Sequence, residues 1–354
     1  PPPIFGSEVR LTTTTLQEAT PAIAWNGTYV GVLYRKGQVS SNGSLLLPDL
    51  YLALLNPDGT RASTPDILVD TNVRYSDIVW TGTEFGVVWV SSSSTYFQRF
   101  SPAGVPKAPI VNISSATPGT VKLGNEPPRI AWSQTYGGYA LAAPSYQEIQ
   151  FQRIGADGTA PDPINPSNAT TYETPVPLAS SPAGDWGLAG RNNSNTLLLF
   201  YNADGSHTKP NVSIASSTGP FDIIHDGVTW SAALASASDI RLNRGETFKT
   251  FTAVFGSFTE GGHVGLSMLG NGVLALKYKD TLYRLRRYTV PSSAASASYS
   301  LIGSTVTLVS SNSAVDLVVE PTGTSQMLAV WQDVRWGVPN AELYAAAMDF
   351  QECP

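Results

Sequence analysis

Short apolar runs separated by turn residues recur along the whole chain, and the clearest example lies at Tyr75–Gly104. Within it, Asp77–Trp80 and Phe85–Val90 are apolar runs joined by the Thr81-Gly82 turn, and Tyr96–Phe100 alternates between apolar and polar residues. Apolar runs of this length between Gly- and Pro-containing segments are typical of strands, and tight turns between them are typical of hairpins. The pattern predicts an all-β chain of short antiparallel strands.

The same pattern is repeated along the sequence. Pro21–Tyr34 aligns without a gap on Ser76–Trp89, so that Trp25 falls on Trp80. A repeat of roughly 40–50 residues with four strands in each copy is typical of a β-propeller blade. We therefore predict one seven-bladed β-propeller domain over residues 1–354, with four antiparallel strands per blade. The blades are expected to begin near residues 21, 75, 128, 176, 221, 264 and 316.

The two ends of the chain are expected to close the ring. The seventh repeat ends with its third strand, Glu342–Met348, and lacks a fourth. Glu8–Thr12 has the character of the missing strand, and we predict that it completes the last blade by lying alongside Leu343–Ala347, which removes the last exposed edges. A Ser- and Ala-rich insertion at residues 291–304 is expected to form a surface loop, either flexible or shaped for a partner.

Charge is scarce, since charged residues make up 14% of the chain and the net charge is −6 with a pI of about 5.1. A nucleic-acid-binding protein needs a basic face, and the one basic cluster is the Arg-Leu-Arg-Arg stretch at residues 284–287, so no nucleic-acid partner is expected. No apolar run approaches the ~18 residues of a membrane-spanning helix. The single cysteine, Cys353, cannot form a disulfide within the chain. The start at Pro1 without Met favours a processed or trimmed N-terminus.

No motif for a phosphate loop, a metal site or a nucleophile elbow occurs, so no cofactor, metal or catalytic residue is predicted. Candidate binding residues are those expected to face the central channel. His225 and His263 lie near the inner strands of two repeats, although a structural role is favoured for both. Asp77, Asp222 and Asp316 lie near the starts of inner strands and are predicted to converge on the channel. A pair of them about 5–9.5 Å apart would have the geometry of a glycosidase.

Trp336 differs from the tryptophans that recur in the repeats. Trp336 lies in a polar loop, where an aromatic side chain is suited to stacking on a sugar or contacting a partner, with packing over the edge of the seventh blade as the alternative. Arg335 beside it is a further binding candidate, and its structural alternative is an ion pair with Asp333 that holds the loop. Three other tryptophans hold one place in successive repeats and are predicted to lie in the core between blades: Trp25, Trp80 and Trp132.

Trp331–Arg335, followed by Glu342–Tyr344, resembles the W-x-D-x-R … (D/E)-(I/L)-Y pattern of secreted bacterial repeat propellers, notably those of myxobacteria. Trp25–Tyr29 and Pro57–Thr60 resemble the phrases W-N-G-T-x-(Y/F) and P-D-G-T of the same proteins. The resemblance covers most of the chain through its repeats. It implies an extracellular seven-bladed propeller with a surface-associated binding or scaffold role, and it assigns no catalytic residue.

These observations favour an exported binding or adhesion module, secreted or at the cell surface, that recognises a protein or a glycan without catalysis; the periplasm is an alternative location. A second hypothesis is a hydrolase or lyase that acts on polysaccharide with channel-facing carboxylates. A third is a structural component of a surface assembly, in which Cys353 or the acidic surface contacts a neighbouring protein.

Overall fold

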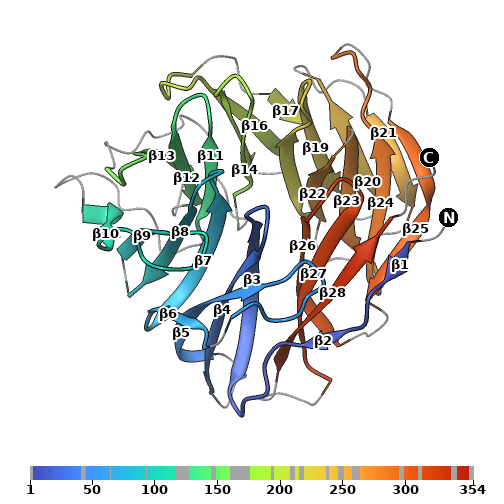
Figure 1. Ribbon diagram of the computed structural model, residues 1–354. Coiled ribbons are helices and arrows are strands. Elements are labelled where there is room, and N and C mark those ends of the chain that lie inside the picture. The colour runs from blue at the N-terminus through green and yellow to red at the C-terminus, as the bar shows by residue number, and fades with distance from the viewer. Residues whose placement is uncertain are drawn as a thin grey trace.

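The computed structural model describes residues 3–40, 45–63, 65–92, 94–115, 127–144, 149–159, 176–192, 195–207, 212–214, 219–236, 239–245, 251–256, 264–270, 272–294, 299–309, 313–335 and 341–350. The strands in these ranges form seven antiparallel sheets, which are set in chain order around a central axis (Figure 1). The predicted all-β, seven-bladed propeller with four antiparallel strands per blade is confirmed.

Each blade is built from consecutive hairpins, and we number the blades in chain order. The strands of blades 1 to 3 are β3 (Gln17–Trp25), β4 (Val30–Val39), β5 (Leu45–Leu55), β6 (Ile67–Asp70); β7 (Val73–Trp80), β8 (Phe85–Ser91), β9 (Ser94–Phe100), β10 (Val111–Asn112); and β11 (Arg129–Ser133), β12 (Gly138–Pro144), β13 (Ile149–Gly155). A 3-10 turn, η1 (Ile113–Ser115), follows β10. Blade 3 therefore has three strands among the described residues.

The remaining blades follow the same plan. Their strands are β14 (Leu178–Ser180), β15 (Trp186–Asn192), β16 (Asn195–Tyr201), β17 (Val212–Ile214); β18 (Phe221–His225), β19 (Trp230–Ala235), β20 (Asp239–Arg244), β21 (Phe251–Gly256); β22 (Val264–Leu269), β23 (Val273–Lys279), β24 (Tyr283–Thr289), β25 (Ser300–Val309); and β26 (Ala314–Pro321), β27 (Gln326–Asp333), β28 (Glu342–Asp349). In the described residues, no helix is long and apolar enough to cross a bilayer.

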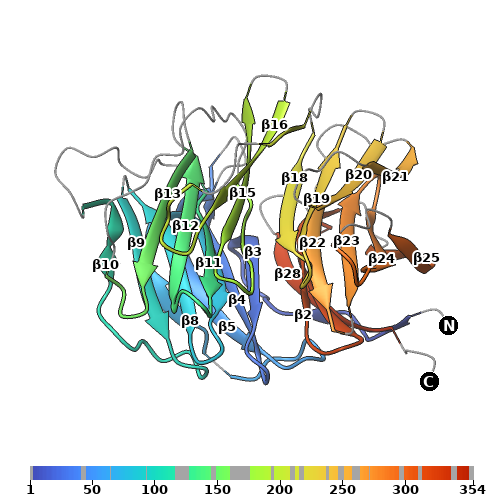
Figure 2. The ribbon, with the colours of Figure 1, turned by 90° about the horizontal axis from the view of Figure 1, so that it is seen from above.

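The chain ends close the ring as predicted. The N-terminal strands β1 (Ile4–Phe5) and β2 (Val9–Arg10) both pair with β28, and Val9 lies opposite Ala345. The Leu11 N–H extends this pairing, because it donates to the Leu343 carbonyl over 2.8 Å. Both views of the ribbon show β2 running alongside blade 7 (Figures 1 and 2). The leading segment thus supplies the outer strands of the last blade.

Glycines on the second strands let neighbouring blades pack tightly. A Cβ on Gly86 of blade 2 would stand 2.3 Å from the Tyr139 ring of blade 3, and a Cβ on Gly187 of blade 4 would stand 2.5 Å from the Trp230 ring of blade 5. A side chain larger than hydrogen would displace those rings, which explains why the repeat carries Gly there. At these positions, an aromatic ring of one blade packs against the bare backbone of the blade before it.

Candidate functional site

The first strands of the blades surround the axis of the ring. Each one contacts the first strand of the next blade, and β26 contacts β3 to complete the circle. Several apolar side chains on these strands are half-buried because they border the axis; examples are Ile23, Val79, Ile224 and Val318. We call the two ends of this channel the strand-start mouth and the strand-end mouth, after the ends of the inner strands that meet there.

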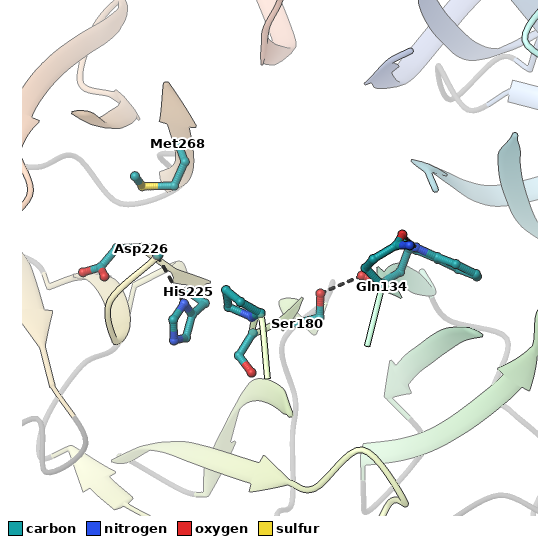
Figure 3. A pocket seen from close by; sticks show the side chains of 9 residues that line it. Gln134, Ser180, His225, Asp226 and Met268 are labelled. Carbon is teal, nitrogen blue, oxygen red and sulfur yellow. Dashed lines mark hydrogen bonds between the residues drawn. The ribbon is translucent and has the colours of Figure 1, made fainter. Parts of the chain in front are cut away.

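A pocket of about 400 Å³ lies at the strand-end mouth. Its walls come from the ends of the inner strands of blades 3 to 6 and from the turns that follow them. Figure 3 shows labelled side chains of these blades disposed around the opening, with Met268 across from Ser180 and Gln134. The lining residues are Trp132, Gln134, Ser180, Ser181, Pro182, His225, Asp226, Gly227 and Met268.

The wall from blades 3 and 4 combines an indole with hydroxyl groups. Trp132, predicted to lie in the core, is only half-buried, and its ring packs edge-on against Tyr139 at a centroid distance of 4.7 Å. The Ser180 hydroxyl donates to the Trp132 carbonyl over 2.6 Å, which joins the two blades and fixes the indole beside the pocket. Trp132 thus packs against the core through Tyr139 and lines the pocket as well.

His225, a predicted binding residue, lines the same pocket from blade 5. Its Nδ1 accepts the Gly227 N–H over 3.2 Å, and its ring packs edge-on against Trp230 at 5.1 Å. Burial lowers the pKa of His225, while Asp226 opposes that shift. The ring is therefore neutral at pH 7, and because Nδ1 is the acceptor, Nε2 carries the proton and can donate.

A buried ion pair lies beneath His225. The Arg244 Nε donates to Asp226 Oδ2 over 2.6 Å, and neither side chain is exposed. Burial acts to raise the pKa of Asp226, but the bonds from Arg244, from the Thr229 N–H and from Ser231 lower it below its usual range. Every oxygen of this carboxylate is thus engaged by protein donors. Asp226 holds the turn that carries His225 and is a supporting residue.

Two of the three predicted channel carboxylates join neighbouring blades. Asp77 of blade 2 accepts the Ile130 N–H of blade 3 over 2.9 Å and pairs with Arg129 at 3.3 Å. Asp222 of blade 5 accepts the Leu266 N–H of blade 6 over 2.7 Å. Burial raises the pKa of both carboxyl groups. We call this contact, an inner-strand carboxylate on the inner-strand amide of the next blade, a carboxylate clamp.

Glu320 forms a third clamp that the sequence analysis missed. Its Oε1 accepts the Trp25 N–H over 3.1 Å, so it joins blade 7 to blade 1. Burial raises the pKa of Glu320 to about 7. The signal that could have found it is its place near the end of an inner strand, two residues after Val318 on the same face.

The predicted site residues do not form a single site. Asp316 lies in a bulge near the start of β26, at the same mouth as Asp77 and Asp222, whereas His225 lies at the other mouth. Arg335 forms the ion pair with Asp333 that was its structural alternative. It also pairs with Glu8, and its Cζ lies 4.4 Å from the centroid of the Tyr344 ring. Trp336 and His263 lie outside the described residues.

In the described part of the chain, no three or more His, Cys, Asp or Glu side chains lie together in a group that could hold a metal ion. The side chains that surround the strand-end pocket are apolar or hydrogen-bonding, and the carboxylates nearest to it are already bonded to backbone amides or to Arg244. The arrangement is suited to recognising a ligand by shape, apolar contact and a few hydrogen bonds.

Comparisons with known proteins bear on the fold. No protein-family model matches the chain, and no curated protein matches it. Among solved structures, the chain is similar to the Dos1 propeller, with a TM-score of 0.57, 7% identity, and 99% and 96% of the two chains covered. The chain is also similar to the WD40 domain of Toxoplasma gondii coronin, with a TM-score of 0.57 and 9% identity, and 99% of this chain and 88% of that one are covered. A third similar structure is BBS1N in complex with ARL6DN, with a TM-score of 0.54 and 11% identity, and 99% of this chain and 97% of that one are covered. At these identities the likeness is one of fold alone.

Proposed function

We propose that this propeller is a non-catalytic binding module that recognises a protein partner through the pocket at the strand-end mouth. The pocket itself carries the proposal. Trp132, Met268 and Pro182 bring apolar surface from three blades to one opening that water reaches. Trp and Met are enriched at protein interfaces, and a group that fills such a pocket contributes most of the binding energy.

Hydrogen-bonding groups around the opening would orient the inserted group. The neutral His225 ring, the Gln134 amide and the Ser180 hydroxyl lie at its rim. The BBS1N propeller in the comparison was solved bound to another protein. A partner that inserts an apolar or aromatic side chain and accepts a bond from His225 suits this chemistry.

A glycan is the second candidate ligand, and one observation favours it. The half-exposed Trp132 indole stands beside the Ser180 hydroxyl and the Gln134 amide. A flat aromatic face next to hydrogen-bonding groups is suited to a sugar ring, which is apolar on its face and polar at its edge. The same pocket variants therefore serve to test both ligands.

The hydrolase or lyase alternative gains no support from the contacts of its named carboxylates. Asp77 and Asp222 each accept an amide proton from the next blade, and Asp77 also pairs with Arg129. The third alternative, a component of a surface assembly, rested in part on Cys353, which lies outside the described residues.

Export to the cell surface or the medium is part of the proposal. It is supported by a surface in which charged residues are replaced by hydroxyl and amide residues, with only 14% charged residues overall, and by the resemblance to secreted repeat propellers. Protease treatment of intact producing cells tests it. Digestion of the protein without lysis, or its recovery from the medium, supports export, and full protection inside intact cells contradicts it.

Binding is tested with a displayed random-peptide library and a glycan array, each probed with the intact chain. Pro182→Arg places a charged side chain at the pocket from an exposed turn, and Ala183→Arg places the same side chain one position further along that turn, outside the lining. We expect ligands that bind the native chain and the Ala183→Arg variant alike but bind Pro182→Arg at least about tenfold more weakly. Ligands that bind both variants equally, or no ligand in either screen, would contradict the proposal.

A further inference from the structure

Six charged side chains gather around the strand-start mouth, and we call them the charged cluster: Arg35, Asp77, Arg129, Asp222, Lys277 and Asp316. Around the ring their signs alternate from blade to blade, except that the inner strand of blade 4, Leu178–Ser180, carries no charge. Electrostatic coupling links Lys277 with Asp222, Arg129 and Asp316, and links Arg35 with Asp316. The cluster is therefore one connected set of charges with equal numbers of each sign.

Lys277 reaches the channel from a second strand through an opening in the inner strand. It lies opposite Gly265 on β22, and a Cβ at Gly265 would stand 3.0 Å from the Lys277 Cε and 3.9 Å from Asp222 Oδ2. A side chain at Gly265 would crowd the end of the lysine, which would have to shift by a few tenths of an ångström. Because Gly265 lacks a side chain, the Lys277 ammonium lies among the inner-strand charges although its own strand is the second of the blade.

Arg35 also reaches the channel from a second strand, past a bulge in the inner strand. The pairing of β3 with β4 shifts register between Ala19 and Ala22, and the Arg35 Nε donates to Thr20 Oγ1 in this bulge over 2.7 Å. Thr20 has a φ of 50°, in the left-handed region that non-glycine residues seldom adopt. The bulge turns the Thr20 hydroxyl toward the arginine.

Asp316 occupies the matching position in the adjacent blade. It has a φ of 49° in the bulge where the pairing of β26 with β27 shifts register between Val315 and Val318. Blade 6 holds this bulge in place, since the Lys277 Nζ donates to the Leu317 carbonyl over 2.6 Å and the Leu317 N–H lies 3.4 Å from the Tyr283 hydroxyl. A left-handed aspartate costs about 1 kcal/mol, and bulges of this kind redirect side chains beside functional sites.

The hydrogen bonds within the cluster leave specific groups unused. The Asp77 and Asp222 carboxylates already accept the amide protons of the next blade in carboxylate clamps. Arg129 donates only to Asp77, over 3.3 Å, and Lys277 donates only to Leu317, in the part of the chain that the structure describes. The Asp316 carboxylate accepts no hydrogen bond from any described residue. The remaining donors thus belong to Arg129, Lys277 and the Arg35 Nη groups, since Arg35 donates only through its Nε among the described residues, and the remaining acceptor is one carboxylate.

We propose that the charged cluster binds a small zwitterion, an α-amino acid, whose carboxylate bonds Arg129 and Lys277 and whose ammonium group bonds Asp316. A zwitterion satisfies both kinds of unused group and leaves the balance of charge in the cluster unchanged. A simple anion would leave the Asp316 carboxylate without a hydrogen-bond donor, and a simple cation would leave the unused donors of the basic groups without an acceptor. Burial, together with Arg129, lowers the pKa of Lys277 to about 8, so the ammonium is charged at pH 7 and a carboxylate beside it is favoured.

Isothermal titration calorimetry of the intact chain with the common L-amino acids tests the proposal. We expect at least one of them to bind at concentrations below about 10 mM, and its amine-free analogue, such as propionate for L-alanine, to bind at least about tenfold more weakly. The absence of binding by every amino acid, or equal binding of the amino acid and its amine-free analogue, would overturn it.

Variants localise the site. Lys277→Met removes the ammonium but keeps the aliphatic stem, and Asp316→Asn removes the charge but tolerates the left-handed conformation. Lys279→Met is the matched control, because the Lys279 Nζ also donates to a carbonyl of β26, that of Ala314, over 3.2 Å. We expect the first two variants to weaken amino-acid binding at least about tenfold and the control to leave it unchanged. Equal affinity in Lys277→Met, or an equal loss in Lys279→Met, would overturn the assignment.

The amino-acid site and the strand-end pocket are independent. Pro182→Arg should leave amino-acid binding unchanged, and Lys277→Met should leave the peptide or glycan ligands of the pocket unchanged, because the two residues lie at opposite mouths. Failure of one proposal therefore leaves the other standing.

Discussion

The two mouths of the channel are formed by the same inner strands, yet their side chains are used differently. At the strand-start mouth, Asp77 and Asp222 bind the amides of the next blade. At the strand-end mouth, the exposed groups are an indole, a thioether, a neutral imidazole and hydroxyls, and the pocket lies among them. Charged side chains gather at the first mouth and link blades there, whereas mostly apolar and uncharged hydrogen-bonding side chains surround the pocket at the second.

The carboxylate clamps follow from a property of propeller inner strands. One edge of each inner strand pairs with its own blade, while the other faces the channel and the next blade, so its amides need acceptors from elsewhere. A carboxylate on the preceding inner strand supplies one, as Asp222 does for Leu266 and Glu320 does for Trp25. A charged residue that faces a propeller channel is therefore not by itself a sign of catalysis.

The largest effect that distinguishes the mouths should come from the clamps. We expect Asp77→Ala or Asp222→Ala to lower the free energy of unfolding by about 3 kcal/mol, because each leaves a buried amide without an acceptor and Asp77→Ala also leaves Arg129 unpaired. Pro182→Arg at the pocket should change it by less than about 0.5 kcal/mol. Urea unfolding followed by tryptophan fluorescence measures all three. An equal loss in the pocket variant would remove the distinction between the mouths.

A smaller effect should appear as a pH dependence at Glu320, the clamp nearest the strand-end mouth. Its pKa is about 7 in the folded chain, against about 4.3 for an unfolded glutamate. The folded state thus holds the proton more tightly, so the contribution of this group to stability is greatest at acidic pH and is lost as the pH rises from about 4.3 to about 7. The loss should be about 2 kcal/mol, since channel water solvates the ion in part.

Glu320→Gln tests this dependence, because glutamine keeps an oxygen for the Trp25 amide but cannot ionise. Urea unfolding at a series of pH values should show a shallower dependence in the variant than in the native chain. Glu8→Gln, the same change at a side chain that is 39% exposed, is the control and should keep the native dependence. Identical pH profiles for the native chain and Glu320→Gln would show that this carboxyl group is not perturbed.

The smallest effect concerns ring closure, which lies outside both mouths. Arg335 pairs with Glu8, which is 39% exposed, and Arg10 pairs with Glu342, which is 3% exposed. Glu8→Gln should cost about 0.5 kcal/mol or less and should cost less still in high salt, since exposed ion pairs contribute little. Glu342→Gln should cost more, about 1–2 kcal/mol, because it removes a buried negative charge that pairs with Arg10 and replaces one of the two carboxylate oxygens with a donor. Thermal unfolding at low and high salt compares them, and equal costs would contradict the burial argument.

The fold was predictable from the sequence because its signals are local. Turns such as Asn56-Pro57-Asp58-Gly59 mark hairpin ends, and Gly59 does adopt a positive φ of 87°. Repetition of the Trp, Gly and turn positions then revealed the blades, and the chain ends gave the closure. The insertion at residues 291–304 was less accurately predicted. β25 begins at Ser300, and Arg244 binds the Pro291 and Ser293 carbonyls, so a side chain from another blade anchors part of that segment.

The candidate site was predicted only in part, because it depends on contacts between blades. His225 was named, but Trp132 was assigned to the core, since its place in the repeat does not show that it also lines a pocket formed by four blades. Asp77 and Asp222 were predicted to face the channel, but their bonds to the next blade were not, because the amide that each one binds lies in another repeat. Lys277 was missed because it reaches the channel from a second strand, past Gly265.

Residue-resolved amide hydrogen exchange of the intact chain tests the carboxylate clamps most directly. We expect slow exchange at the Ile130, Leu266 and Trp25 amides, which donate to carboxylates of the preceding blade. We also expect Asp222→Ala to accelerate exchange at Leu266 while Ile130 stays protected. Fast exchange at all three amides in the native chain would show that the channel carboxylates do not hold the blades together.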